Sequence, residues 1–171
     1  MAVEFHDFSI EVKEWIKEKA IAGLYEAAGE LVSQVQRNLD KEVGSWFTDQ
    51  KNAWRYEVDE ENLVATIGNP QERSLWTEFG TGEYAQHGDG RKGYWIYVKE
   101  SEGEAGGSSY AYKGGKSYTL DEAKQIVAMM RDDGLDAHYT KGQRPRKPFQ
   151  TAYTKLRPVI GRIFEDKFKG G

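Results

Sequence analysis

The sequence predicts an α+β fold: a long N-terminal helix packed on a small, mainly antiparallel sheet, with a middle helix and a C-terminal helix. Three patterns lead to this prediction. They are an apolar stripe at helical spacing over residues 9–38, two alternating segments between residues 53 and 67, and an apolar segment at 94–98. At 171 residues, the chain has the length of one domain with its own core, so we expect a single domain over residues 1–171.

The N-terminal helix is predicted over Ser9 to Asn38. Its apolar stripe recurs every three or four residues and consists of Val12, Ile16, Ala20, Leu24, Ala27, Leu31 and Val35. Burying each larger member is worth about 1.5–3 kcal/mol, so the helix is expected to pack on a sheet. Ser9 is the expected N-cap, because its hydroxyl can accept a hydrogen bond from an amide of the first turn.

Three strands are predicted after this helix. Trp54, Tyr56 and Val58 alternate with polar residues over 53–58, and a polar link at 59–62 suits a hairpin turn to a second strand at 63–67. The segment 94–98 is apolar on both faces, as expected for a central strand. Residues 100–117 contain five glycines, so we expect a flexible loop that becomes ordered on contact with another subunit.

Two further helices are predicted. Thr119 and Glu122 form a capping box at the start of the middle helix, and Gly134 is suited to end it in the left-handed conformation. Its apolar side is expected to consist of Ile126, Val127, Met129 and Met130. The last helix starts near Pro148, and Pro158 within its apolar pattern is expected to kink or interrupt it.

The composition excludes several classes of site. Without cysteine the chain has no disulfide and no thiolate metal ligand. No apolar run approaches the ~20 residues of a membrane span, and residues 1–7 lack the regions of a signal peptide. We therefore expect no membrane partner, and expect the protein to stay in the compartment where it is made.

Charge is distributed unevenly along the chain. From Lys141 onward nine basic residues stand against two acidic ones, a net +7, so the preceding 140 residues carry −11. Such a basic end can bind nucleic acid, or it can pair with the acidic part of a neighbouring copy. A solvated basic helix is the third interpretation, and the sequence leaves all three open.

Enzyme motifs do not match. Gly115-Lys116-Ser117 ends like a phosphate-binding loop, but Tyr110 occupies the position of the first glycine. His6, His87 and His138 are far apart and are expected in termini or loops exposed to solvent. The many carboxylates have no distinguishing spacing, so a two-acid hydrolase rests on their number alone. We expect no enzymatic activity, no cofactor and no metal site.

Two motifs remain. Trp76 and Phe79 are three residues apart, so one helical turn would place them on the same face, and Gly80 and Gly82 allow positive φ or close backbone approach. Residues 142–149, Gly-Gln-Arg-Pro-Arg-Lys-Pro-Phe, read as an extended segment before a helix, because each proline disfavours helix in the residue before it. Taken locally, the first motif is a glycine-rich turn and the second a solvated linker.

A wider set of residues carries a family resemblance. It consists of Trp-x-Glu-Phe-Gly-Thr-Gly-Glu-Tyr-Ala at 76–85, Gly-Asp-Gly-Arg-Lys-Gly-Tyr-Trp-Ile-Tyr at 88–97 and Thr-Lys-Gly-Gln-Arg-Pro-Arg-Lys-Pro-Phe at 140–149. Together these segments resemble the head–tail joining and tail-completion family of tailed bacteriophages, particularly its members in prophages of Gram-positive bacteria. In that family a long N-terminal helix leads into a small sheet carrying the turn that corresponds to Glu78–Gly82. A Pro-Phe pair, here Pro148-Phe149, then opens a C-terminal helix, although Gln150 replaces the apolar residue that the family more often has.

The resemblance implies a structural protein of the virion neck or tail and not an enzyme. It would form an oligomeric ring between phage connector and tail proteins, assembled in the bacterial host cytoplasm, through which DNA passes without specific binding. We expect the basic segment 141–157 to meet a neighbour's acidic surface. The alternative function is a nucleic-acid-binding module that uses the basic C-terminal segment with Phe149 and Tyr153. The residues implied as family-motif and assembly positions are Trp76, Glu78, Phe79, Gly80, Thr81, Gly82, Trp95, Arg144, Arg146, Pro148 and Phe149.

Overall fold

The computed structural model describes residues 8–41, 45–88, 90–99, 110–112 and 115–169. Its contacts divide the chain into two compact units, Met1–Ser74 with Lys147–Gly171 and Leu75–Arg146. We call them the helical unit and the sheet unit. The predicted α+β class is confirmed. That the chain is one domain stays a prediction, because two contact clusters can still unfold as one cooperative domain.

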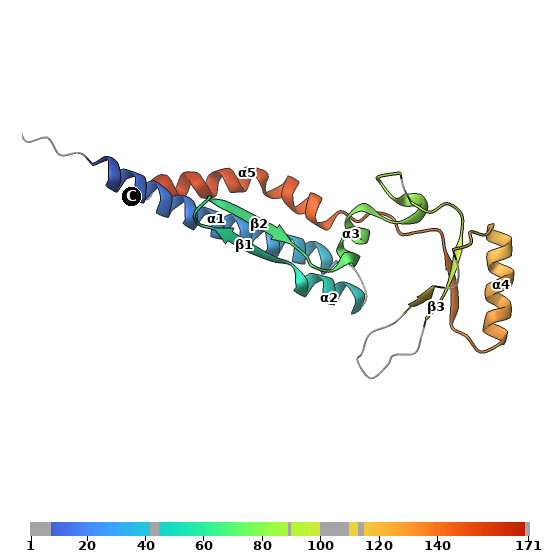
Figure 1. The fold of residues 1–171 in the computed structure, drawn as a ribbon. Coiled ribbons are helices and arrows are strands. Elements are labelled where there is room, and N and C mark those ends of the chain that lie inside the picture. The colour runs from blue at the N-terminus through green and yellow to red at the C-terminus, as the bar shows by residue number, and fades with distance from the viewer. Residues whose placement is uncertain (1–7, 42–44, 89, 100–109, 113–114, 170–171) are drawn as a thin grey trace, which may run out of the picture. The chain divides into compact units, whose positions relative to one another are not determined.

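The helical unit is built on two long antiparallel helices. Figure 1 shows α1 and α5 side by side, with the hairpin of β1 and β2 along α1. At one end the rings of Trp15 and Phe168 meet edge to face at 5.9 Å, and at the other Asn38 Nδ2 donates to the carbonyl oxygen of Pro148 at 2.9 Å. The prediction of a long helix on a small antiparallel sheet is therefore confirmed. The elements of this unit are α1 (Ser9–Leu39), α2 (Ser45–Ala53), β1 (Arg55–Asp59), β2 (Val64–Gly68) and α5 (Pro148–Lys169).

The core of the helical unit lies in the seam between α1 and α5. Leu31, Val35 and Leu39 of α1 are buried against Ala152 and Leu156 of α5. Within each helix these residues recur every four residues, so each helix presents one face to the other. Partly buried side chains complete the cluster around this seam: Trp54, Ile67, Phe149 and Val159.

The predicted stripe of α1 is buried only along part of its length. Val12 and Ile16 are 51% and 45% exposed, whereas the buried residues of α1 start at Gly23. The end of α5 lies level with Trp15, so the first turns of α1 extend beyond the helix that covers the rest of the stripe. The spacing of apolar residues predicted which face of α1 is apolar. It could not predict how much of that face another element would cover.

Two details of the helices differ from the predictions. Ser9 is the first residue of α1 and Phe8 occupies the cap position, so the prediction of Ser9 as N-cap is wrong. Helix starts are assigned to within one or two residues, and here the backbone turns one residue earlier. Pro158 lies inside α5, which continues through it without interruption. Two residues before it, Leu156 is buried in the cluster with Leu31, Val35 and Leu39 of α1.

The hairpin of β1 and β2 is antiparallel, with Arg55 opposite Gly68 and Asp59 opposite Val64. Its turn is closed by Asp59, whose carboxylate accepts hydrogen bonds from the amides of Glu61 and Asn62 at 3.0 and 2.9 Å. Short polar side chains commonly bond the backbone two or three residues on in this way. The predicted hairpin is confirmed to within two residues at each boundary.

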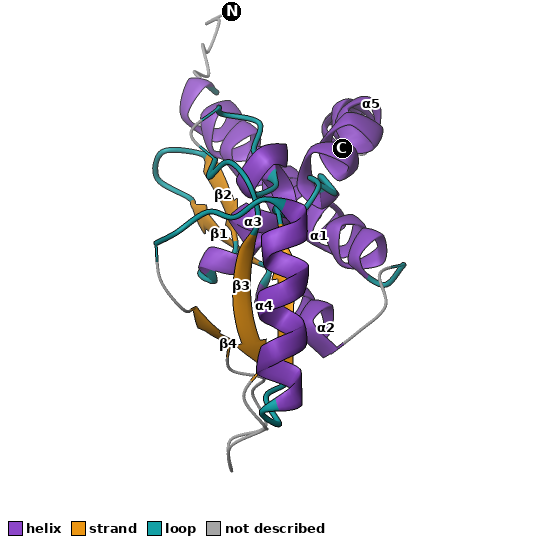
Figure 2. Cartoon of the chain, turned by 90° about the vertical axis from the view of Figure 1, so that its right-hand side faces the viewer, coloured by secondary structure: helices purple, strands orange, loops and turns teal. Residues whose placement is uncertain are grey.

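The sheet unit is organised around β3 (Trp95–Lys99), which lies between β4 (Tyr110–Tyr112) and β5 (Ala137–Thr140) in an antiparallel sheet. This confirms the prediction that the segment 94–98 is a central strand. The helix α4 (Leu120–Asp132) lies along β3 (Figure 2). The core between them consists of Ile96, Val98, Val127 and Ala137, with Tyr118, Ile126 and Met130 packed against it.

The start of α4 has the predicted capping box. The Thr119 amide donates to Glu122 Oε2 at 2.8 Å, and the Glu122 amide donates to Thr119 Oγ1 at 3.4 Å. Gly134 follows the helix with φ +82°, as predicted. Met129 is 67% exposed, so its predicted place on the apolar side is wrong, because it falls outside the arc that Ile126, Val127 and Met130 turn toward β3.

Several elements were not predicted, among them α2, α3 and β5. Helix α2 is short and polar, and its carbonyls at Gln50 and Lys51 accept hydrogen bonds from Asn69 and Gln36. Helix α3 (Glu72–Phe79) extends the single turn expected around Trp76, and the two units divide within it. Strand β5 is four residues long, too short for alternation to identify. Each depends on contacts distant in sequence.

The expected flexible loop at 100–117 falls mostly outside the described residues. Within it, 110–112 form β4, whose residues Tyr112 and Tyr110 pair with Tyr97 and Lys99 of β3. Part of this segment therefore belongs to the sheet.

Candidate functional site

The two sequence motifs meet in the sheet unit, although about 60 residues separate them. The Thr81 amide donates to the Gln143 carbonyl oxygen at 2.9 Å, and the Gln143 amide donates to Thr81 Oγ1 at 2.9 Å. The Glu83 amide donates to the Lys141 carbonyl oxygen, also at 2.9 Å. We call residues 80–83 and 141–143, joined by these bonds, the motif junction.

Glycine is required at the motif junction because two backbones approach closely. Gly82 has φ +60°, and a Cβ there would lie 2.3 Å from the Lys141 carbonyl oxygen and 2.5 Å from the Trp95 ring. Gly142 has φ +123°, and its Cβ would lie 2.1 Å from the Thr81 carbonyl oxygen. Gly80, at φ +76°, is enclosed in the same way by Gln143 and Tyr84. The expected positive φ and close approach at Gly80 and Gly82 are both confirmed.

Helix α3 carries the motif residues that precede the junction. Glu78 is buried, whereas Trp76 and Phe79 are partly exposed. The Phe79 ring packs on His87 with centroids 5.0 Å apart. The second motif is attached here too, because the Arg146 amide donates to the Thr77 carbonyl oxygen at 2.8 Å. The junction and α3 thus hold the extended segment 141–146 at both of its ends.

Glu83 and Lys141 add an ion pair across the junction, with Lys141 Nζ 3.2 Å from Glu83 Oε2. The hydrogen bond from Lys141, followed by the one from the Gly93 amide, lowers the pKa of Glu83 below its ordinary value. The bond to Glu83 is also the largest cause that raises the pKa of Lys141, followed by Tyr84. Both shifts favour the charged forms, so the pair strengthens the junction at neutral pH.

Aromatic rings and cations gather beside the junction. Lys141 Nζ lies 5.3 Å from the Tyr84 ring centroid and 6.0 Å from that of Tyr94, and Arg144 Cζ lies 5.1 Å from the Tyr84 centroid. Arg91 Cζ lies 5.3 Å from the Trp95 ring. These distances are in the range of cation–π attraction. We call the following set the cation–aromatic cluster: Tyr84, Arg91, Lys92, Tyr94, Trp95, Lys116, Lys141 and Arg144.

The structure divides the expected assembly residues between the two units. Trp76, Glu78, Phe79, Gly80, Thr81, Gly82, Trp95, Arg144 and Arg146 belong to the sheet unit. Pro148 and Phe149 open α5 in the helical unit. There the Phe149 ring stacks on Trp54 at 5.5 Å with an interplanar angle of 8°, within the core cluster. Phe149 therefore packs within the helical unit.

The basic residues of the C-terminal end are divided between the two units. Lys155 Nζ donates to Gln34 Oε1 at 3.1 Å, and Lys167 Nζ lies 2.6 Å from Glu26 Oε2. Both are contacts within the helical unit. The basic residues of the junction are instead joined by Arg91, Lys92 and Lys116, which the charge count did not select. The interleaving of cations with aromatics at 91–95 was the signal that could have identified them.

The two described histidines lie apart from each other, and His6 lies outside the described residues. His87 lies in a loop beside Phe79, whereas His138 lies on β5 and not in the loop expected for it. His138 Nε2 is 2.8 Å from Asp136 Oδ1, and its ring stacks on Tyr97. Within the described ranges, no three His, Cys, Asp or Glu side chains converge to hold a metal ion.

Comparisons with known proteins add no relative. No family model, curated protein or solved structure matches the chain. Among the helices that the structure describes, none is long and apolar enough to cross a membrane.

Proposed function

We propose that this chain is a structural virion protein of a tailed bacteriophage or prophage that joins head and tail. In this proposal it acts in the neck or tail-completion layer, as an oligomeric ring between connector and tail proteins. The proposal assigns it no catalytic residue and no cofactor. It rests on the resemblance of the motifs at 76–85, 88–97 and 140–149 to the head–tail joining family.

The observation that carries the proposal is the motif junction. The residues of the resemblance are widely separated in sequence, yet Thr81 and Gln143 are hydrogen-bonded to each other, with glycines at the closest approaches. A structural protein would need both motifs for this reason, because each segment of the junction holds the backbone of the other in its conformation. A chance occurrence of short motifs would not require them to meet.

Ring formation is tested by the mass of the purified protein in solution and by negative-stain images of the same sample. We expect a closed ring, formed by the protein alone or on addition of the neighbouring connector or tail protein. A ring repeats one heterologous contact around an axis, so its mass is a whole multiple of the chain. A protein that stays monomeric under both conditions contradicts the ring.

The role in joining is tested in a phage or lysogen that encodes the chain. Removing it should leave heads and tails that accumulate separately, and supplying the protein should restore joined particles. We also expect Arg144→Glu with Arg146→Glu to impair joining, since both belong to the segment expected to meet an acidic surface. Joined particles in the absence of the chain would refute the proposal whatever the state of the ring.

The alternative, a nucleic-acid-binding module at the basic C-terminal segment, requires different residues from those first expected. Phe149 stacks on Trp54, and Lys155 and Lys167 are engaged by Gln34 and Glu26. These contacts argue against α5 as the binding element. The cation–aromatic cluster belongs to the sheet unit and is considered on its own chemistry.

A further inference from the structure

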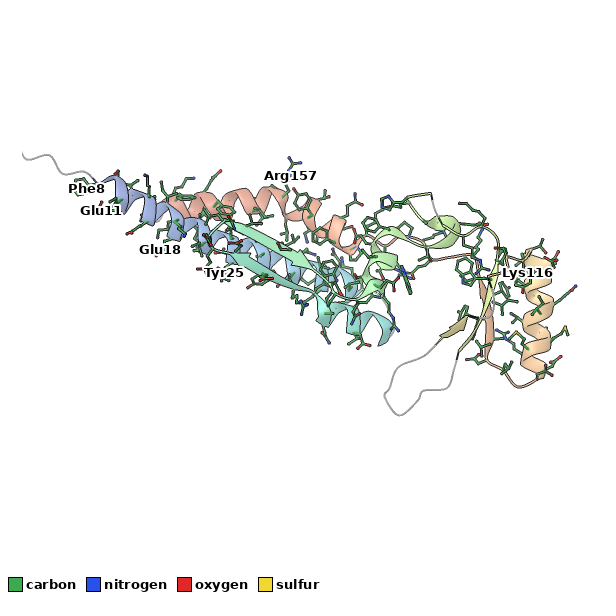
Figure 3. All side chains as sticks on the ribbon, viewed as in Figure 1. Phe8, Glu11, Glu18, Tyr25, Lys116 and Arg157 are labelled. Carbon is green, nitrogen blue, oxygen red and sulfur yellow. The ribbon has the colours of Figure 1, made fainter. Side chains whose placement is uncertain are left out.

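The cation–aromatic cluster gathers five cations from three segments of the sheet unit. Arg91 links two of them, because its guanidinium donates to the Lys116 carbonyl oxygen and to Ser117 Oγ, the latter at 3.2 Å. Lys92 lies close enough to Glu83 to help lower the pKa of that carboxyl. Lys141 is paired with Glu83 and lies near the Tyr84 ring, as does Arg144. Figure 3 labels Lys116 on the stretch that leads into α4.

The cluster carries a surplus of positive charge. Two carboxylates lie beside it among the described residues. Glu83 is held by Lys141 and the Gly93 amide. Glu122, whose pKa is lowered mainly by its hydrogen bonds with Thr119, also interacts with Lys116. Five cations against these two carboxylates leave a net charge of about +3 at neutral pH. Lys92, Lys116 and Arg144 are exposed, so this charge faces solvent.

The rings of the cluster position its cations. Tyr84 has both Lys141 and Arg144 near its ring, and Trp95 has Arg91. Because these ring faces are taken by the chain's own cations, they are poorly placed to stack on nucleotide bases. Holding the charged groups in place also reduces the entropy lost when they bind a ligand.

We propose that the cation–aromatic cluster binds the phosphate backbone of double-stranded nucleic acid without reading its sequence. Duplex DNA carries one negative charge per roughly 1.7 Å of its axis, and neutralising phosphates releases condensed counterions. Five cations around one rigid backbone junction match such a ligand. Because cations lie over its rings, the cluster contacts phosphates and not bases.

A protein partner fits the charge of this surface less well. The centres of protein–protein interfaces are enriched in arginine and aromatic side chains but depleted of lysine, whereas nucleic-acid interfaces are more polar and much more positively charged. The cluster has three arginine or lysine residues exposed and its aromatic rings beneath cations. This inference goes beyond head–tail joining and does not depend on ring formation.

The experiment measures fluorescence anisotropy of two short labelled DNA duplexes of unrelated sequence with the full-length chain. We expect equal affinity for both sequences. If about three phosphates are neutralised, affinity should fall about 40-fold between roughly 50 and 200 mM salt, a log–log slope near −2.7. Strong preference for one sequence, or the absence of binding at the lowest salt, overturns the proposal.

Matched variants assign the binding to the cluster. Lys92→Gln with Arg144→Gln removes two exposed cations and should reduce the salt slope by about 2. Arg157→Gln with Arg162→Gln removes two exposed cations from α5 and should leave affinity and slope unchanged. Circular dichroism of each variant checks that the fold is kept. An equal loss in both double variants would mean that net charge and not the cluster binds DNA.

A polyglutamate competitor separates nucleic acid from an acidic protein surface. We expect DNA to remain bound when polyglutamate is added at the same concentration of charges. Displacement of DNA by polyglutamate, with the same loss in the Lys92→Gln, Arg144→Gln variant, would assign the cluster to a carboxylate-rich protein partner and overturn the nucleic-acid proposal.

Discussion

The helical unit and the sheet unit are stabilised in different ways. The helical unit is stabilised by the packing of buried side chains, since Leu31, Val35 and Leu39 fill the seam between α1 and α5. The sheet unit has a smaller apolar core around β3, together with a junction in which two backbones touch where Gly82 and Gly142 have no side chain. Truncating a buried side chain should therefore destabilise the helical unit. Adding a side-chain carbon at the motif junction should destabilise the sheet unit.

The largest effect is expected from truncating the core of the helical unit. Leu39→Ala removes a side chain that is 2% exposed, and substitutions of this kind cost about 3–5 kcal/mol through lost burial and the cavity left behind. The free energy of unfolding in urea measures it. Met129→Ala, at a 67% exposed position of α4, should change stability by less than about 0.5 kcal/mol. Similar losses in the two variants would mean that the α1–α5 seam is not a packed core.

A smaller but more specific effect is expected from adding one carbon to the motif junction. In Gly82→Ala the left-handed backbone costs about 1–2 kcal/mol, and overpacking against Lys141 and Trp95 adds about 1–3 kcal/mol. Gly134→Ala is the matched control: its φ is +82°, and nothing lies within 4 Å of the added carbon. Urea unfolding of the two variants isolates the contribution of the close approach. If Gly134→Ala is as harmful as Gly82→Ala, the junction is not close-packed.

The capping box of α4 should contribute about 1 kcal/mol. Thr119→Ala leaves the Glu122 amide without its hydroxyl partner, and such changes usually cost about 0.5–2 kcal/mol. In the control Thr154→Ala, the lost hydroxyl donates only to the Gln150 carbonyl oxygen within α5. That substitution should be nearly neutral, because alanine is the best helix former. Thermal unfolding of both variants measures the difference, and a neutral Thr119→Ala would contradict the cap.

The subtlest expected effect is the pH dependence of the junction. Glu83 has a lowered pKa, so its contribution to stability is present above its ordinary value of 4.5 and is lost as pH falls through the folded value. Lys141 has a raised pKa, so its contribution is present below 10.5 and is lost as pH rises through the folded value. The pair should therefore stabilise the junction across the whole range between pH 4.5 and 10.5.

Carbon-detected NMR titration of the Glu83 carboxyl measures the first of these shifts. The midpoint should lie below 4.5, and Lys141→Gln should move it upward, because its largest cause is the bond to Lys141. A midpoint at or above 4.5 in the native sequence would show that the ion pair does not form in solution.

Local signals in the sequence predicted the elements whose cause is local. Thr119 and Glu122 satisfy each other's amides within one turn, so four residues were enough to locate the start of α4. Asp59 and the polar link after it likewise located the hairpin. Elements supported by distant contacts were missed: α2, whose end is held by Asn69 and Gln36, and β5, which exists because β3 pairs with it.

The candidate site follows the same division. The glycines of the turn, the aromatic pair of α3 and the cations before α5 were all selected from the sequence. Their partners were not, since no local pattern links Thr81 to Gln143 or Arg91 to Lys116. Phe149 was assigned to the assembly residues because it adjoins the motif, whereas its ring stacks on Trp54 in the other unit.

By itself the sequence determined the α+β class, the helical faces, the capping box and the need for positive φ at Gly80 and Gly82. These follow from the geometry of a few consecutive residues. Only the tertiary structure decided which part of the α1 stripe is covered, that the two motifs form one junction, and which cations gather beside it. These features depend on contacts between segments that are distant in the sequence. Such contacts produce no local pattern in the sequence from which they could be predicted.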